Sequence, residues 1–185
     1  MGERRQRVCP VECAGGLDNR VRRWFQNPGK ILGPYIKEGM TVLDVGCGPG
    51  FFSLEMARLV GASGRVISAD LQEGMLQKLR SKISGSALEK RIILHQSAAH
   101  EIGVKDSVDF VLAFYMVHEV PDQQKFLTEI KSLLKPKGLL LIVEPPMHVS
   151  RKAFEETVAR AQNTGFAVSE RPYVFLSKAV VLKNT

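Results

Sequence analysis

Three glycines at alternating positions, Gly46, Gly48 and Gly50, follow the mostly apolar stretch 41–45. Glycine permits tight turns and a close approach of the backbone to a ligand. In an open parallel sheet, ligands bind beyond the carboxyl ends of the strands. The dinucleotide fingerprint needs a further glycine at position 51, where Phe51 stands. The spacing therefore predicts a nucleotide-like ligand without that fingerprint.

Three side chains near the ends of later predicted strands are candidates for catalysis: Tyr115, His118 and Glu144. A histidine can take a proton from a hydroxyl or thiol near neutral pH. The alternative for His118 is that it orders its loop or contacts a cofactor. Glu144 points toward the same edge of the sheet, or it anchors a loop. Tyr115 orients a substrate or fills the core, and the sequence leaves both readings open.

Short β-branched or aliphatic runs alternate with helical patterns from residue 41 onward, and these elements must position the candidates. We predict strands at 41–45, 65–70, 91–95, 108–114, 138–143, 168–176 and 178–183, and helices at 51–60, 73–83, 122–134 and 150–163. This alternation is typical of an α/β fold with helices on both faces of a parallel sheet. The last two strands add an antiparallel edge hairpin. We expect a Rossmann-like, doubly wound, mostly parallel sheet of seven strands.

Residues 1–40 do not follow this alternation, so we expect an N-terminal extension before a domain at 41–185. Only 145–150 separate the fifth predicted strand from the next helix, which leaves little chain there to cover a ligand. We therefore expect residues 1–40, with a predicted helix at 17–26, to form a cap over the active site. In this cap, Trp24 and Phe25 offer apolar area for a substrate, although packing alone also explains Trp24. Arg20, Arg22 and Arg23 offer positive charge.

The stretch 42–50 resembles the first motif of the class I S-adenosylmethionine-dependent methyltransferases, in particular the compact branch with the ubiquinone and menaquinone methyltransferases. The resemblance covers about residues 40–145 closely and the last forty in outline. It implies that the domain at 41–185 binds S-adenosylmethionine. The cofactor-binding residues implied are Asp44, Gly46, Cys47, Gly48, Gly50, Asp70, Leu71, Ser97, Ala98 and Phe114.

The resemblance also implies individual roles. Asp70 matches the acidic residue that accepts hydrogen bonds from both ribose hydroxyls, and a carboxylate forms strong charge-assisted bonds with such donors. Ser97 stands where an acidic residue often binds the adenine amino group, and its hydroxyl can accept one hydrogen bond. The backbone of Ala98 can contact the ring. The backbone carbonyl of Phe114 falls where the amino group of the methionine moiety binds.

The same resemblance implies an enzyme, a methyltransferase that acts on oxygen, sulfur, carbon or a soft metalloid of a small molecule. Such an enzyme can act largely by aligning the acceptor, so a general base is optional. Methylases of exocyclic base amines resemble one another in an Asn/Asp-Pro-Pro-Tyr/Phe element, and residues 113–116 lack it. The alternatives are a non-catalytic binding module and an RNA methyltransferase recruited by the basic N-terminus.

Composition and charge limit the remaining classes. The 185 residues fit about one domain, and no apolar run is long enough for a membrane-spanning helix. No secretory signal is visible. The net charge of +7, partly from residues 1–40, suits a solvated tail, an anionic substrate, a membrane surface or nucleic acid. The sequence does not fix the oligomeric state.

Three cysteines, Cys9, Cys13 and Cys47, match no zinc-site spacing. We therefore expect free thiols, a cytoplasmic location and no metal site. One alternative stays open, in which the three thiols come together and bind a soft metal or metalloid. The other is that they are small apolar residues with no ligand.

Overall fold

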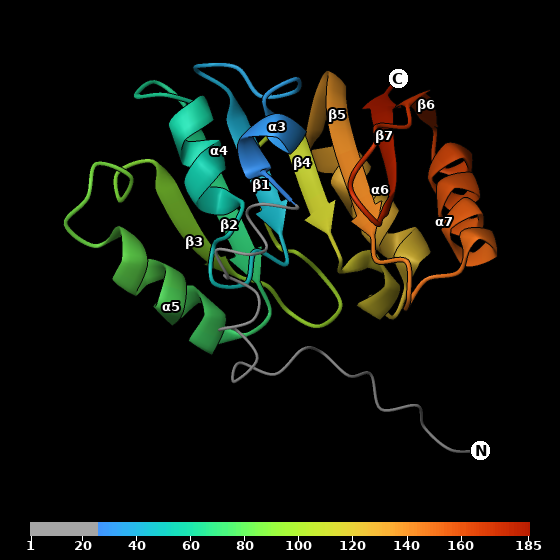
Figure 1. The fold of residues 1–185 in the computed structure, drawn as a ribbon, viewed down its shortest axis with the longest axis horizontal. Coiled ribbons are helices and arrows are strands. Elements are labelled where there is room, and N and C mark those ends of the chain that lie inside the picture. Colours follow the sequence, from blue (N-terminus) through green and yellow to red (C-terminus); the bar gives the residue numbers. More distant parts are fainter. Residues whose placement is uncertain (1–25) are drawn as a thin grey trace.

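The computed structural model describes residues 26–185, which form a seven-stranded sheet in the order β3-β2-β1-β4-β5-β7-β6 (Figure 1). The strands are β1 (Thr41–Val45), β2 (Arg65–Asp70), β3 (Ile92–Gln96), β4 (Val108–Phe114), β5 (Leu134–Glu144), β6 (Phe166–Glu170) and β7 (Lys178–Asn184). Strands β1 to β5 pair in parallel. Strand β7 is antiparallel to both β5 and β6. The predicted mostly parallel sheet with an antiparallel edge hairpin is confirmed.

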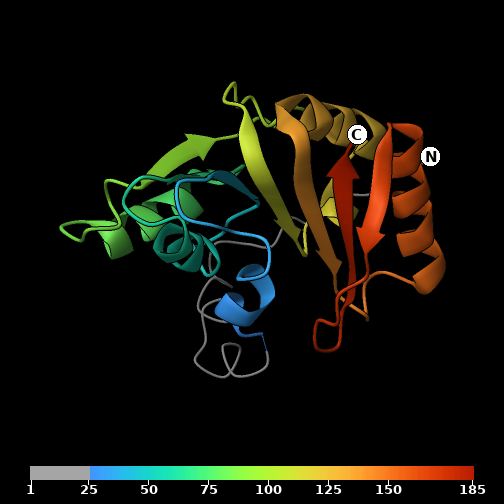
Figure 2. The same cartoon turned by 90° about the horizontal axis from the view of Figure 1, so that it is seen from above.

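Helices cover both faces of this sheet (Figure 2). The helices are α3 (Pro28–Leu32), α4 (Ser53–Leu59), α5 (Glu73–Ile83), α6 (Gln123–Leu133) and α7 (Arg151–Asn163), with a 3-10 turn, η2, at Val117–Glu119. One buried apolar cluster joins the sheet to α3, α4 and α5. A second cluster joins the opposite face to α6 and α7. The doubly wound arrangement is therefore confirmed as well.

The local sequence explains where helices α6 and α7 begin and which face of α6 is buried. The side chain of Asp122 accepts a hydrogen bond from the Lys125 amide (2.9 Å) and caps α6. Ser150 caps α7 in the same way through the Ala153 amide (3.1 Å). The buried face of α6 carries the apolar residues spaced at the helical period, such as Leu127 and Ile130. Burial of each such side chain stabilises the fold by about 1.5–3 kcal/mol.

The structure differs from the sequence-based prediction most clearly at β5, β6 and α3. Strand β5 begins at Leu134 instead of residue 138, directly after α6, and its register with β4 shifts before residue 139. Lys137 adopts a left-handed conformation (φ 67°) in this irregular part. Strand β6 ends at Glu170, so 171–177 form a loop. Helix α3 was not predicted, because it is only five residues long.

Residues 26–40 pack against the sheet. Leu32 and Ile36 are buried in the cluster that holds α4 and α5. The ring of Tyr35 stacks on Phe110, with 6.0 Å between centroids. Burial and a neighbouring Glu170 raise the pKa of Tyr35 well above its ordinary value. The predicted cap over the active site falls mostly on residues 1–25, which lie outside the described part of the chain, so it stays a prediction.

The predicted helix at 17–26 lies outside the described residues, except for Gln26. Also outside are Cys9, Cys13, Arg20, Arg22, Arg23, Trp24 and Phe25. Within residues 26–185, no helix combines the length and the apolar character needed to cross a bilayer.

Candidate active site

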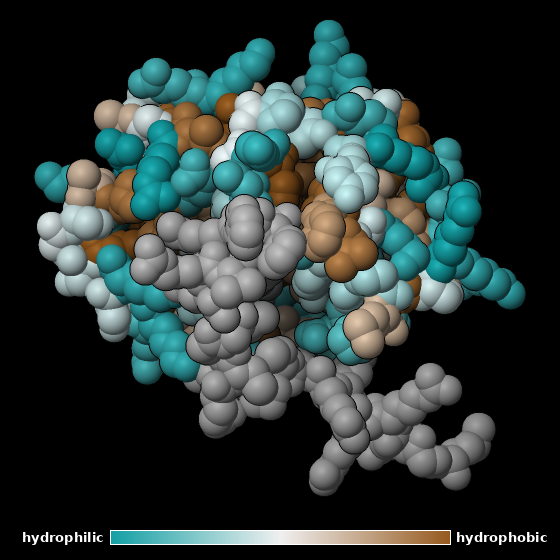
Figure 3. Space-filling view, viewed as in Figure 1, coloured by the Kyte–Doolittle hydropathy of each residue, from teal (hydrophilic) through white to brown (hydrophobic). Residues whose placement is uncertain are grey.

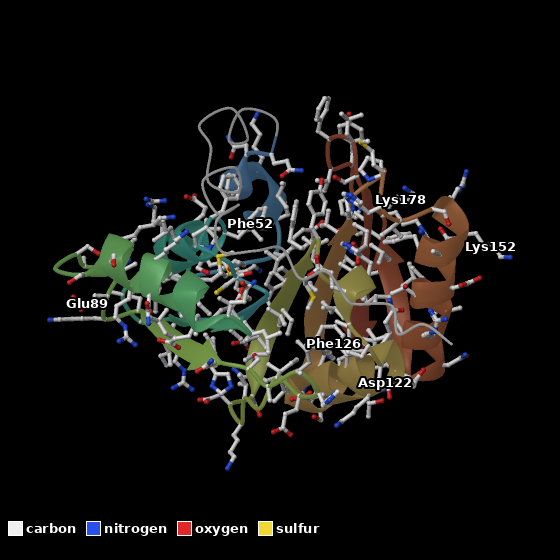
Figure 4. All side chains as sticks on the ribbon, turned by 90° about the horizontal axis from the view of Figure 1, so that it is seen from below. Phe52, Glu89, Asp122, Phe126, Lys152 and Lys178 are labelled. Carbon is white, nitrogen blue, oxygen red and sulfur yellow. The ribbon has the colours of Figure 1, made fainter. Side chains whose placement is uncertain are left out.

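A cavity of about 490 Å³ opens at the carboxyl ends of the central strands. It lies where the strand order reverses between β2-β1 and β4, the usual position of a ligand in an open α/β sheet. The loops after β1, β2, β3 and β4 and the start of α6 line it. Figure 4 shows Phe52 on one side of this end of the molecule and Phe126 with Asp122 on the other.

The glycine loop after β1 forms one wall. Gly46, Gly48 and Gly50 all adopt left-handed conformations, with φ of 69°, 54° and 87°. A Cβ added to Gly46 would lie 3.1 Å from Met116, and one added to Gly50 would overlap Leu79. A Cβ on Gly48 would meet no atom of residues 26–185 within 4 Å. The backbone at Gly48 is therefore open to a ligand, whereas Gly50 is needed for packing on α5.

Asp70 at the end of β2 holds this loop in place. Its Oδ2 accepts a hydrogen bond from the Gly48 amide, and its Oδ1 accepts one from the Gln72 amide, both at 2.8 Å. Burial raises the pKa of Asp70, and the two amide hydrogen bonds oppose that rise. Each carboxylate oxygen keeps capacity for a further hydrogen bond. The carboxylate is thus oriented before any ligand binds.

Two further predicted cofactor residues stabilise or line the same wall. Asp44 is buried, and its Oδ2 accepts a hydrogen bond from the Ser53 hydroxyl (2.5 Å) at the start of α4. Burial raises the pKa of the Cys47 thiol, and the charges of Asp44 and Asp70 raise it further. Because metal binding uses the thiolate, this environment disfavours a soft metal at Cys47.

The loop after β3 forms the next wall and contains Ser97 and Ala98. The Ser97 hydroxyl oxygen is buried and has no hydrogen-bond partner among the described residues. Buried polar groups are normally paired, so this oxygen is available to a ligand. Glu129 of α6 fixes the end of the loop by accepting hydrogen bonds from the Ile102 and Gly103 amides, each at 2.9 Å to its Oε1. No sequence pattern distinguishes Glu129 from the other polar residues of its helix.

Phe114 and Tyr115 form the edge of the cavity after β4. Tyr115 has a left-handed backbone (φ 59°), which is uncommon for a bulky residue. Its hydroxyl accepts a hydrogen bond from Gln26 Nε2 (2.6 Å) and shares another with Ser177 Oγ (2.5 Å). Tyr115 therefore connects the segment before α3 with the loop between β6 and β7.

His118 and Glu144 form a close pair beside the cavity. Glu144 Oε1 accepts a hydrogen bond from the His118 amide (2.9 Å), and Glu144 Oε2 lies 2.6 Å from His118 Nδ1. The bond to Glu144 raises the pKa of His118, and burial partly opposes the rise. Neither residue belongs to the cavity lining found within residues 26–185. The two hydrogen bonds link η2 to the end of β5.

Glu119 is the acidic group of η2 that lines the cavity, and the sequence-based selection of site residues missed it. Its Oε1 lies 4.0 Å from His118 Nε2. Burial raises the pKa of Glu119 most, and the charges of Glu144 and Asp70 add to this; His118 and His148 lower it. Its position beside a histidine, in the segment 117–122 after β4, was the available signal.

The structure brings most of the predicted cofactor residues together. Of the predicted site residues, those that line the cavity are Asp44, Gly46, Cys47, Gly48, Asp70, Leu71, Ser97, Ala98 and Phe114, together with Tyr115 from the catalytic candidates. Gly50, His118 and Glu144 stand behind this lining among the described residues. Their binding or catalytic roles remain predictions.

Comparison with known proteins assigns the class. Residues 36–173 match a methyltransferase domain family. The crystal structure of an S-adenosylmethionine-dependent methyltransferase from Aquifex aeolicus superposes with a TM-score of 0.87 at 29% identity, and covers 96% of this chain and 100% of that one. The fold and this likeness define a class I S-adenosylmethionine-dependent methyltransferase. The chain belongs to the methyltransferase domain family.

The chain is also similar in sequence to curated methyltransferases. A demethylmenaquinone methyltransferase from Lactobacillus johnsonii is 38% identical over 130 residues, which are 70% of this chain and 51% of that protein. One from Lactococcus lactis is 31% identical over 147 residues, which are 76% of this chain and 58% of that protein. The chain therefore spans about half the length of the curated relatives it matches.

Proposed function

We propose that this chain transfers a methyl group from S-adenosylmethionine to a small aromatic or quinone-like nucleophile. The observation that carries the proposal is one cavity that runs from Gly48 and Asp70 to Tyr115 and Glu119. One side of this cavity, called the cradle below, is polar and contains Gly48, Asp70 and Ser97, and the other side has an aromatic edge formed by Phe52, Phe114 and Tyr115. The relatives named as demethylmenaquinone methyltransferases support an aromatic acceptor.

The residues at the cradle fit the cofactor. Asp70 would accept the ribose hydroxyls, since both of its oxygens are already oriented by backbone amides. Ser97 would pair with the adenine through a hydroxyl oxygen that no described residue satisfies. The absence of any atom near a Cβ on Gly48 leaves room for close approach. When bound, S-adenosylmethionine supplies the methyl group as an electrophile on its sulfonium.

The opposite side would hold the acceptor. The rings of Phe52, Phe114 and Tyr115 lie in contact, with centroid distances of 4.3 and 4.4 Å between neighbours. Such an edge can orient a flat apolar ring. Glu119 can take the proton that an acceptor hydroxyl or carbon loses, because it is an acidic residue of the cavity lining. His118 and Glu144 would position η2 and therefore Glu119.

Calorimetric titration with S-adenosylmethionine and S-adenosylhomocysteine tests the cradle. Asp70→Ala removes the oriented carboxylate, so we expect affinity for both to fall at least about thirtyfold. Asp106→Ala is the matched control, because Asp106 forms a surface ion pair with Arg65 (2.8 Å) and does not line the cavity. Equal affinity in wild type and Asp70→Ala would contradict the assignment.

Methyl release over a panel of hydroquinones, phenols and thiols then tests the acceptor side. We expect turnover with hydroquinones, measured as S-adenosylhomocysteine formed. Cofactor binding without turnover on any of them would favour the non-catalytic module. Methylation of RNA, with binding that weakens steeply as salt increases, would favour the RNA methyltransferase instead.

A further inference from the structure

Three strongly exposed apolar side chains lie on two neighbouring loops at the same end of the sheet as the cavity. Met147 is 92% exposed, Tyr173 is 86% exposed and Leu176 is 65% exposed. The loops meet because Glu144 pairs with Lys178 across β5 and β7, and Lys178 Nζ donates to the Val149 carbonyl oxygen (2.8 Å). Figures 1 and 2 show both loops leaving the sheet together.

Packing within the described chain does not account for these side chains. Val149 and Val174 are buried and anchor the two loops, so the exposed residues are not needed for that purpose. Leu176 also has a left-handed backbone (φ 46°), where asparagine or glycine would be less strained. A leucine that is both strained and exposed gains little from the fold itself.

Cations flank these side chains. Arg151 and Lys152 begin α7 directly after the first loop; both are exposed, and within residues 26–185 they form no ion pair. A helix N-terminus disfavours positive charge, so helix stability does not explain them. Figure 4 shows Lys152 pointing outward from α7. Arg171 at the start of the second loop neutralises Glu155 through a bidentate pair (2.8 and 2.9 Å).

We propose that the loop surface, formed by Met147, Tyr173, Leu176, Arg151 and Lys152, docks on an anionic lipid bilayer. Apolar side chains at loop tips can insert into the boundary between headgroups and acyl chains, and adjacent cations pair with anionic headgroups. The net charge of +7 acts in the same direction. Figure 3 shows that hydrophobic atoms are exposed among hydrophilic ones on this face of the described chain.

The choice of a bilayer over a protein follows from this arrangement. The apolar side chains stand on two loops, and Arg151 and Lys152, which form no ion pair within residues 26–185, begin the helix that follows the first loop. The inference does not depend on the identity of the acceptor. It would place the mouth of the cavity toward the membrane.

Co-sedimentation with vesicles tests the proposal without any measurement of activity. The full chain should sediment with phosphatidylcholine vesicles that contain phosphatidylglycerol, and much less with phosphatidylcholine alone. Arg151→Glu with Lys152→Glu should weaken partitioning at least about fivefold per cation. Tyr173→Ser with Leu176→Asn should weaken it about tenfold or more. Asparagine tolerates the left-handed backbone, so the second variant adds no strain.

Matched controls lie outside the loop surface, on β3 and the segments beside it. Ile93→Ser removes a 46% exposed apolar side chain from β3, and Lys90→Glu with Lys105→Glu reverses two exposed cations. These controls should bind vesicles almost as well as wild type. Arg4→Ser, Arg5→Ser and Arg7→Ser together separate the basic N-terminus from the loop surface and should leave most of the binding.

Three outcomes would overturn the proposal. The first is no binding to the anionic vesicles, and the second is equal losses in the loop variants and in the matched controls. The third is a dimer, seen by size-exclusion chromatography, that Tyr173→Ser with Leu176→Asn dissociates, because the surface would then join two copies of the chain.

Discussion

The two sides of the cavity are built in different ways. On the proposed cofactor side, backbone groups determine the geometry: the amides of Gly48 and Gln72 hold Asp70, and the left-handed glycines shape the loop. On the proposed acceptor side, side chains hold one another: Glu144 holds His118, and Tyr115 connects Gln26 with Ser177. A short motif can therefore specify the first side, whereas the second depends on residues far apart in the sequence.

The largest effect is expected where the glycine loop meets α5. Gly50→Ala would force a left-handed alanine against Leu79, which is fully buried and cannot move aside freely. We expect the free energy of unfolding to fall by about 3 kcal/mol, measured by urea denaturation. Gly85→Ala is the control, because its φ is 71° and its Cβ would meet no atom within 4 Å. It should cost only about 1 kcal/mol. Equal losses would show that packing on α5 is not what requires Gly50.

The next largest effect is expected on catalytic activity, from a substitution at Glu119. Glu119→Gln removes the proposed proton acceptor but keeps its shape, so kcat/KM for a hydroquinone should fall about 100-fold. In the wild type, kcat/KM should increase as the pH passes the raised pKa of Glu119, and the variant should lose this dependence. Glu101→Gln, on the cofactor side of the cavity, should retain nearly full activity. A variant that keeps both its rate and its pH dependence would exclude Glu119 as the base.

The smallest effect concerns the pair behind η2. The pKa of His118 is raised above its ordinary 6.5, so the stability that the charged pair contributes is complete below about pH 6.5. It is lost as the pH rises through the folded-state pKa. The stability difference between wild type and His118→Asn should therefore be larger at about pH 5.5 than at about pH 9, by about 1 kcal/mol because solvent screens the pair. Urea denaturation at both pH values measures this.

Glu144→Gln provides the control for the charged pair. In that background, the effect of His118→Asn on stability should depend on pH much less, because only burial and the charge of Glu119 still act on the pKa of His118. A dependence of undiminished size would assign it to another titrating group.

Much of the fold could be predicted from the sequence because its signals are local. The buried strands β1, β2 and β4 match the predicted runs at 41–45, 65–70 and 108–114, and capping residues locate α6 and α7. The start of β5 could not be predicted. It depends on pairing with β4 through a shifted register, and no local pattern shows that.

The candidate site divides in the same way. Asp70 and Gly48 could be predicted because the motif and the strand end determine where they lie. The role of Glu129 could not, because it depends on amides of a loop 26 or 27 residues away in the sequence. His118 and Glu144 were predicted to lie at the same edge of the sheet. The sequence could not show that Glu144 accepts a hydrogen bond from the His118 amide and lies within hydrogen-bond distance of its ring. Glu119, the next residue of η2, lines the cavity.

The hydroxyl of Tyr115 has one further consequence. Because this single oxygen bonds to both Gln26 and Ser177, the chain before α3 and the hairpin between β6 and β7 share one anchor. Loss of that hydroxyl would remove one hydrogen bond from each of the two segments at once. A residue of the cavity lining thus ties together two parts of the chain that lie about 150 positions apart in the sequence.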